Sequence, residues 1–202
     1  ALGLLRCRRD GLLAAYCRAL SGRLAELSEQ EMSNTVYALG LLGYRPEAFL
    51  YELCSQMSGR FSEFKPQGIS ISAYSLGLLD FRHGGFFGSV SSQVPSRLAE
   101  FTTQGISNIA YAYCLLRLKD AVFMEAIGLH LAGRLRECRP QHIANVVYAL
   151  GLLGHRSDRF LGAVAEHIRG RLCEFKPEEI SITIYAFGLL GYAHEDLLQA
   201  VC

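Results

Sequence analysis

The chain has 202 residues, of which 50% are hydrophobic and 19% are charged, and its formal net charge at pH 7 is +1. This composition can build a continuous core and excludes a disordered chain. The near-neutral charge gives little long-range attraction for nucleic acid. No apolar run reaches the roughly 18 residues that cross a bilayer, so no membrane partner is expected.

The sequence repeats itself every 37 residues. The repeated segment is SNTVYALGLLG at Ser33, SISAYSLGLLD at Ser70, SNIAYAYCLLR at Ser107, ANVVYALGLLG at Ala144 and SITIYAFGLLG at Ser181. A fixed period of this length is typical of a solenoid, in which each small unit buries its apolar face only against its neighbours. We therefore predict one all-α domain, a right-handed α-solenoid of stacked two-helix hairpins over residues 1–202.

The predicted repeats follow one another without a gap. They comprise a partial repeat at 1–28, complete repeats at 29–65, 66–102, 103–139 and 140–176, and a partial repeat at 177–202. Residues 1–5 match 38–42 in phase, so the chain is expected to begin inside a repeat. Because the ends of a solenoid need polar capping repeats, we expect a fragment of a longer protein.

Each repeat is predicted to hold two helices. The first helix opens with a proline in three repeats, because proline suits the first helical turn. It is expected to end at the glycines that follow the Leu-Leu pairs, namely Gly43, Gly154 and Gly191. The second helix carries a buried phenylalanine column, Phe49, Phe86, Phe123 and Phe160. In the repeat at 66–102, Gly84, Gly85 and Pro95 predict a bent or shortened second helix.

Two positions of the repeat hold the same residue type in every copy, and we call the residues at one such position a column. Tyrosine occupies the middle of the first helix, at Tyr37, Tyr74, Tyr111, Tyr148 and Tyr185. Arginine occupies Arg23, Arg60, Arg97, Arg134 and Arg171, with glutamate three residues later in each repeat. We interpret the Arg-Glu pairs as structural, with phosphate contact as the alternative. The tyrosines are interpreted as packing residues whose hydroxyls reach backbone groups, with base stacking as the alternative.

The period, the Gln-x-Ile-Ser-Asn start and the Tyr-Ala-Leu-Gly-Leu-Leu-Gly core resemble the heptatricopeptide and octotricopeptide repeats, and the length of 37 residues favours the heptatricopeptide form. These are helical-hairpin arrays of organellar proteins, some with a RAP domain and some similar to FAST kinases. The resemblance implies binding of single-stranded RNA in mitochondria, or alternatively in plastids. It further implies a transcript or translation factor, or a mitochondrial ribosome component that contacts rRNA and other ribonucleoprotein subunits.

Residues of equal phase should form rows along the concave face of such an array, where helical repeats can read bases. The predicted RNA-binding residues lie in three rows: Asn34, Asn108 and Asn145 in the first, Thr35, Ser72 and Thr183 in the second, and Lys65, Arg139 and Lys176 just before the first helices. Asparagine offers donors and acceptors to a base edge, and cations near helix N-termini suit a phosphate backbone. The alternatives are local backbone hydrogen bonds for the polar rows and a solvated face for the cations.

Other functional classes receive less support. The seven cysteines are odd in number and lack CxxC spacing, which predicts small buried side chains in a reducing compartment and no metal. No nucleophile, base and orienting residue recur together, and no phosphate-binding Gly-rich loop is found, so we expect neither an enzyme, a cofactor nor a small-molecule substrate. The alternative to RNA binding is a protein-protein interaction scaffold within a large assembly.

Overall fold

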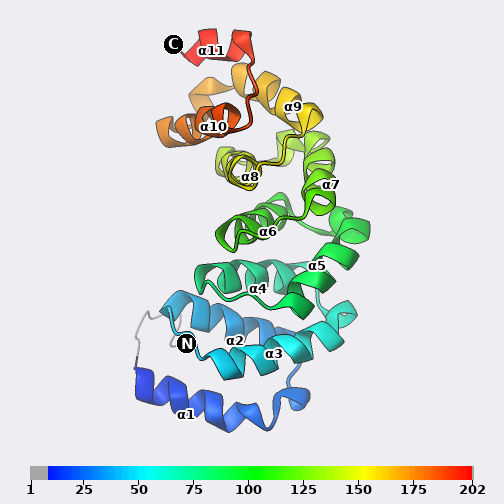
Figure 1. The fold of residues 1–202 in the computed structure, drawn as a ribbon, viewed down its shortest axis with the longest axis vertical. Coiled ribbons are helices and arrows are strands. Elements are labelled where there is room, and N and C mark those ends of the chain that lie inside the picture. Colours follow the sequence, from blue (N-terminus) through cyan, green and yellow to red (C-terminus); the bar gives the residue numbers. More distant parts are fainter. Residues whose placement is uncertain (1–8, 202) are drawn as a thin grey trace. The chain divides into compact units, whose positions relative to one another are not determined.

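The computed structural model describes residues 9–201, and every regular element in that range is helical (Figure 1). The all-α prediction is confirmed. We call one set of helices the first helices: α2 (Glu29–Leu42), α4 (Pro66–Leu78), α6 (Thr103–Leu115), α8 (Pro140–Leu153) and α10 (Pro177–Leu189). The second helices are α1 (Asp10–Ser21), α3 (Glu47–Gly59), α5 (Gly84–Arg97), α7 (Ala121–Ala132), α9 (Asp158–Arg169) and α11 (Glu195–Val201). None of the helices in the described range has the length and apolar character needed to span a membrane.

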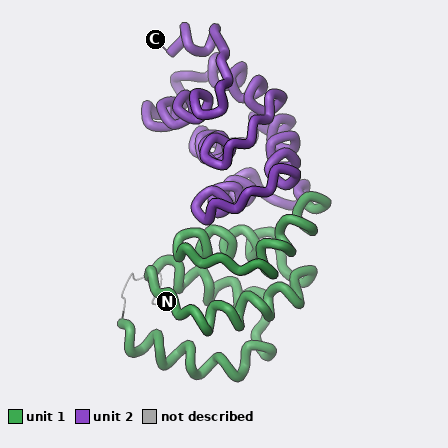
Figure 2. The backbone as a smooth tube through the Cα atoms, viewed as in Figure 1, with its two compact units in different colours: residues 1–97 green, residues 98–202 purple. Residues whose placement is uncertain are grey.

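The chain divides into two compact units, residues 1–97 and 98–202 (Figure 2). In the first unit α2 packs on α4, and α3 contacts both α1 and α5. In the second unit α8 contacts both α6 and α10, and α9 contacts both α7 and α11. Each unit therefore has a layer of first helices and a layer of second helices. The division falls inside the predicted repeat 66–102, and the single-domain organisation stays a prediction.

Local sequence explains where the first helices begin. Proline occupies the first position of α4, α8 and α10, where its missing N–H would have no helical partner. Ser28 caps α2, because its Oγ accepts a hydrogen bond from the Glu31 N–H at 3.3 Å while Glu31 accepts from the Ser28 N–H at 2.8 Å. Thr102 caps α6 through the Gly105 N–H at 3.1 Å. The starts of α2, α4, α6, α8 and α10 are consequently 37 residues apart.

The first helices end where the sequence predicts. Gly43, Gly154 and Gly191 have φ angles of 59°, 71° and 60°, in the left-handed region that glycine adopts without a Cβ clash. The equivalent turns after α4 and α6 have Asp80 and Arg117, which adopt φ angles of 49° and 51°. The turn therefore forms even in repeats that lack the glycine.

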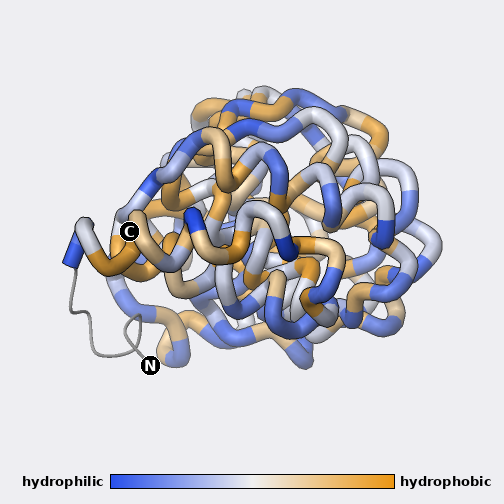
Figure 3. The backbone as a smooth tube through the Cα atoms, turned by 90° about the horizontal axis from the view of Figure 1, so that it is seen from below, coloured by the Kyte–Doolittle hydropathy of each residue, from blue (hydrophilic) through white to orange (hydrophobic). Residues whose placement is uncertain are grey.

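The buried hydrophobic residues come from both layers of each unit, and hydrophobic and hydrophilic residues are interspersed along the chain (Figure 3). The predicted phenylalanine column is buried, at Phe49, Phe86, Phe123 and Phe160. Of the predicted bend or shortening of the second helix at 66–102, the shortening is wrong, because α5 runs for 14 residues with Pro95 inside it, and the bend stays a prediction. Burial of Phe86, Val90 and Val94 holds this helix together despite the hydrogen bond that Pro95 cannot donate.

Adjacent first helices approach closely through small residues. A Cβ built on Gly40 of α2 would lie 2.7 Å from the Cβ of Ser75 in α4. A Cβ built on Gly151 of α8 would lie 2.9 Å from the Cβ of Ala186 in α10. Both glycines occupy the same position in their repeats, so the Gly in the repeated Leu-Gly-Leu-Leu segment sets the distance between these helices.

Three arginines of the column, Arg60, Arg97 and Arg134, each donate to a carbonyl of the preceding repeat. The Arg60 Nη1 donates to the Leu27 carbonyl at 2.8 Å, and the Arg134 Nη1 donates to the Phe101 carbonyl at 3.0 Å. The remaining guanidinium nitrogens bind the glutamate three residues later, as in the Arg134–Glu137 pair at 2.7 Å. These contacts agree with the structural interpretation of the pairs, and the contact that joins repeats is the one to the carbonyl.

Cysteine reactivity should follow burial in this fold. Of the cysteines in residues 9–201, Cys17, Cys54, Cys114 and Cys138 are buried and Cys173 is exposed. Burial raises the pKa of the Cys54 thiol to about 12, which leaves almost no thiolate at pH 8. We expect iodoacetamide at pH 8 to modify Cys173 first and Cys54 only after addition of urea, as measured by peptide mass spectrometry. Modification of Cys54 in the folded chain at the rate of Cys173 would contradict the packing of α3.

Candidate nucleic-acid interface

One stripe of every first helix faces away from its neighbours and remains at least partly exposed. In α8 the stripe consists of Gln141, Asn145, Tyr148 and Leu152, whose spacing of four, three and four residues follows one side of a helix. The equivalent stripes are Gln30, Asn34, Tyr37 and Leu41 in α2, Gln67, Ile71, Tyr74 and Leu78 in α4, Gln104, Asn108, Tyr111 and Leu115 in α6, and Glu178, Ile182, Tyr185 and Leu189 in α10. We call these residues the open face of each unit.

The structure places the predicted asparagine row on the open face. Asn34 is exposed, and Asn108 and Asn145 are half-buried. Because α6 packs against α8 in the second unit, Asn108 and Asn145 occupy the same turn of neighbouring helices. Their amides can therefore face one ligand together.

The predicted hydroxyl row lies elsewhere. Thr35, Ser72 and Thr183 are buried, in the column that holds the buried Ile109 and Val146 in the other repeats. The Thr35 and Thr183 hydroxyls each donate at 2.8 Å to the carbonyl four residues earlier. The structure therefore does not bring these three side chains to the open face. In the sequence, the hydrophobic residues at the equivalent positions, Ile109 and Val146, indicated that this column is buried.

The predicted cations stand at the N-terminal edge of the open face. Lys65, Arg139 and Lys176 are exposed and immediately precede α4, α8 and α10. Lys65 lies 3.9 Å from the Glu29 carboxylate, while 81% of its side chain is exposed. In the second unit Arg139 and Lys176 precede adjacent helices, so a phosphate chain crossing this edge would meet both charges and the helix N-termini.

A second column of cations follows the first helices and is absent from the predicted site. It consists of Arg45, Arg82, Lys119 and Arg156, each 37 residues after the last. The Arg45 Nη1 donates to the Leu79 carbonyl at 3.2 Å, and the Arg156 Nη1 donates to the Gly191 carbonyl at 2.9 Å. Arg82 and Lys119 are exposed. The sequence could have indicated this column, because its four cations recur at intervals of 37 residues.

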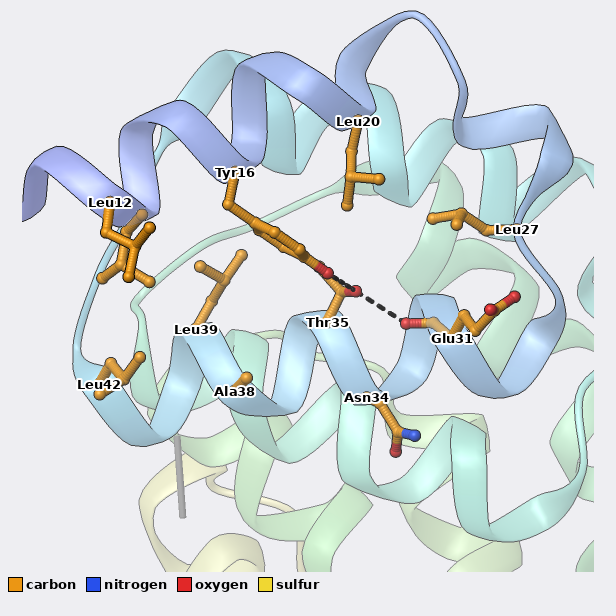
Figure 4. Close-up of a pocket in the computed structure, with 11 residues that line it drawn as sticks. Leu12, Tyr16, Leu20, Leu27, Glu31, Asn34, Thr35, Ala38, Leu39 and Leu42 are labelled. Atoms are coloured by element: carbon orange, nitrogen blue, oxygen red, sulfur yellow. Dashed lines mark hydrogen bonds between the residues drawn. The ribbon is translucent and has the colours of Figure 1, made fainter. Parts of the chain in front are cut away.

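An apolar pocket of about 580 Å³ lies between α1 and α2 in the first unit (Figure 4). It is lined mainly by leucines, with Tyr16 on α1 and Thr35 on α2. The Tyr16 hydroxyl lies 3.2 Å from the Thr35 Oγ1, and the Asn34 amide points away from Tyr16 (Figure 4). No cation lines the pocket, so it does not suit a phosphate chain, and the open face is the candidate interface.

The structure offers no group of three or more histidine, cysteine, aspartate or glutamate side chains that could hold a metal ion among residues 9–201. The chemistry of the open face is therefore that of amides, phenol rings, aliphatic side chains, the Glu178 carboxylate and flanking cations. Such a surface binds ligands through hydrogen bonds, stacking and charge.

The packed neighbouring helices define an all-helical protein of the helical-repeat class. The sequence model of a family described as the Tbc2 translation factor, N-terminal domain, matches residues 99–201. This match covers just over half of the chain, and the chain belongs to this family. The matched segment coincides with the second compact unit, residues 98–202. No curated protein sequence matches the chain.

Proposed function

We propose that the protein acts in translation as an RNA-binding factor that holds single-stranded RNA on its open face. The observation that carries this proposal is the family match to a translation factor domain over the second unit. That unit presents Asn108 and Asn145 on adjacent helices, beside the cations Arg139 and Lys176. Amides can read base edges and cations can hold phosphates, so both parts of an RNA strand find partners.

The finer points of the proposal rest on the resemblance to heptatricopeptide repeats. We infer a right-handed stacking of the hairpins with the 37-residue period, and an organellar location, in mitochondria or alternatively in plastids. The RNA would be a transcript or, within a mitochondrial ribosome, rRNA. The protein would act by binding and not as an enzyme.

A protein-interaction scaffold is the second candidate, and it has its own supporting observation. The open face exposes large apolar groups, since Leu152 and Leu189 are 47% and 46% exposed. Exposed apolar rows can mark a surface that binds a partner helix. The net charge of +1 also limits the electrostatic attraction for RNA.

Salt dependence separates the two candidates. We expect Lys65, Arg139 and Lys176, changed together to alanine, to weaken binding to a randomised 12-nucleotide single-stranded RNA pool. The slope of log affinity against log salt should become shallower by roughly 0.7 for each phosphate contact that is lost on a single strand. The measurement is fluorescence anisotropy at several potassium chloride concentrations.

A matched control removes the same charge from the other layer. Arg18 of α1 and Arg159 and Arg169 of α9 are exposed cations on second helices. Their joint change to alanine lowers the net charge equally, yet it should leave most of the slope in place. Equal slopes for the two triple variants would mean that the N-terminal edge of the open face is not the phosphate path and would favour the scaffold.

A further inference from the structure

We propose that the tyrosines of the open face are stacking platforms for RNA bases, and that the residue one turn earlier decides whether the stacked base is read. This inference rests on the proposed function and concerns the second unit, where α6, α8 and α10 lie side by side. In α6 and α8 the tyrosine follows an asparagine by three residues; in α10 it follows Ile182. Side chains three residues apart on a helix are neighbours.

The tyrosines of this row are not core residues. Tyr185 is 55% exposed, while Tyr148 and Tyr111 are partly buried. By contrast, Tyr113 on the same helix as Tyr111 is 1% exposed, and its ring centroid lies 4.7 Å from that of Phe123. The fold therefore uses Tyr113 for packing, while it leaves more than half of the Tyr185 side chain and a smaller part of the Tyr148 side chain open to solvent.

The row has the geometry that a splayed strand requires. Tyr111, Tyr148 and Tyr185 stand at the same turn of three adjacent helices, and packed helices are about 8–10 Å apart. Other helical-repeat proteins present one base to each repeat at such intervals. Leu115, Leu152 and Leu189 follow one turn later and give each ring an apolar flank.

The mixture of side chains favours RNA over a partner helix. An amphipathic helix needs a continuous apolar groove, whereas here Gln141 and Asn145 precede the ring of Tyr148 on the same stripe. A base has both an aromatic face and a polar edge, so a phenol ring and an amide on adjacent turns can contact one base together. The α10 stripe lacks the amide and should stack any base.

Substitution of the ring tests the stacking. We expect Tyr148→Leu and Tyr185→Leu each to weaken binding of the full chain to the randomised 12-nucleotide RNA pool by about tenfold, because a base loses its stacking partner. Tyr148→Phe keeps the ring and should bind within about twofold of the unchanged chain. The salt slope should stay the same in all three variants, because no charge is removed.

Tyr51 provides the control, since it is 63% exposed on the second helix α3. Tyr51→Leu should leave RNA affinity unchanged. If Tyr148→Leu binds as the unchanged chain does while the cation triple variant still loses affinity, the stacking inference is wrong and the proposed function stands. If the unchanged chain binds peptides and does not bind the RNA pool at all, the stacking inference and the proposed function are both wrong.

Exchange of asparagine and isoleucine tests whether the residue one turn before the tyrosine recognises the stacked base. Asn145→Ile gives α8 the isoleucine-tyrosine pair of α10, so selection from the RNA pool should lose its base preference at one position while total affinity changes by less than about threefold. Ile182→Asn should create a preference at a further position, with discrimination of about tenfold against the wrong base. The measurement is sequencing of the bound fraction. A base preference that survives in Asn145→Ile unchanged would overturn this part of the inference.

Discussion

Replacing Gly151 by alanine is expected to lower the free energy of unfolding by about 2 kcal/mol, although alanine is the better helix former. The new Cβ would lie 2.9 Å from the Ala186 Cβ and 3.1 Å from the Ala186 Cα. Neither atom can move away by rotation about a side-chain bond, so α8 and α10 must separate and lose contact along their length. Urea unfolding followed by circular dichroism gives the change.

Gly188 offers a control within the same unit. It occupies the same position in α10 as Gly151 in α8, but a Cβ there would have no atom within 4 Å. Gly188→Ala should therefore raise the free energy of unfolding by up to about 1 kcal/mol, since only the helix propensity changes. The two substitutions are chemically identical and should act in opposite directions. A stabilising Gly151→Ala would show that α8 and α10 do not approach as closely as the structure indicates.

The helix boundaries could be predicted from sequence because they depend on local chemistry. Proline at the start of α4, α8 and α10 and glycine after α2 and α8 act through their own backbone preferences. Asp80 and Arg117 were not predictable as left-handed residues, since a Cβ disfavours this conformation. In those repeats the turn closes with the same backbone hydrogen bond as at Gly43, from Phe81 N–H to the Leu76 carbonyl and from Leu118 N–H to the Tyr113 carbonyl, each at 2.9 Å.

The candidate site could be predicted only in part. Asn34 and Thr35 are adjacent in sequence, but a helix rotates by about 100° per residue, so one faces solvent and the other faces α1. Polarity alone does not separate them, because the Thr35 hydroxyl is satisfied by the Glu31 carbonyl inside its own helix. The contact of Arg45 with the Leu79 carbonyl, 34 residues away, needed the packed fold.

Arg134→Ala is expected to lower the free energy of unfolding by about 2 kcal/mol. Arg134 donates to the Phe101 carbonyl at 3.0 Å, and Phe101 is 1% exposed. Removal of the guanidinium leaves this carbonyl without its charged donor in a place that water reaches poorly. Urea unfolding measures the loss, and RNA affinity of the folded fraction should be retained because Arg134 lies outside the open face.

The partner of Arg134 in the surface ion pair should matter much less. Glu137 is largely exposed, so Glu137→Gln should unfold at nearly the same urea concentration as the unchanged chain. His130 gives an independent reading, because burial lowers its pKa and the positive charge of Arg134 lowers it further. In Arg134→Ala the His130 pKa should rise toward its ordinary value, which NMR titration can follow. If Arg134→Ala instead loses RNA affinity and keeps its stability, the arginine column is a phosphate contact. The hydrogen bond to the preceding repeat then does not contribute to stability.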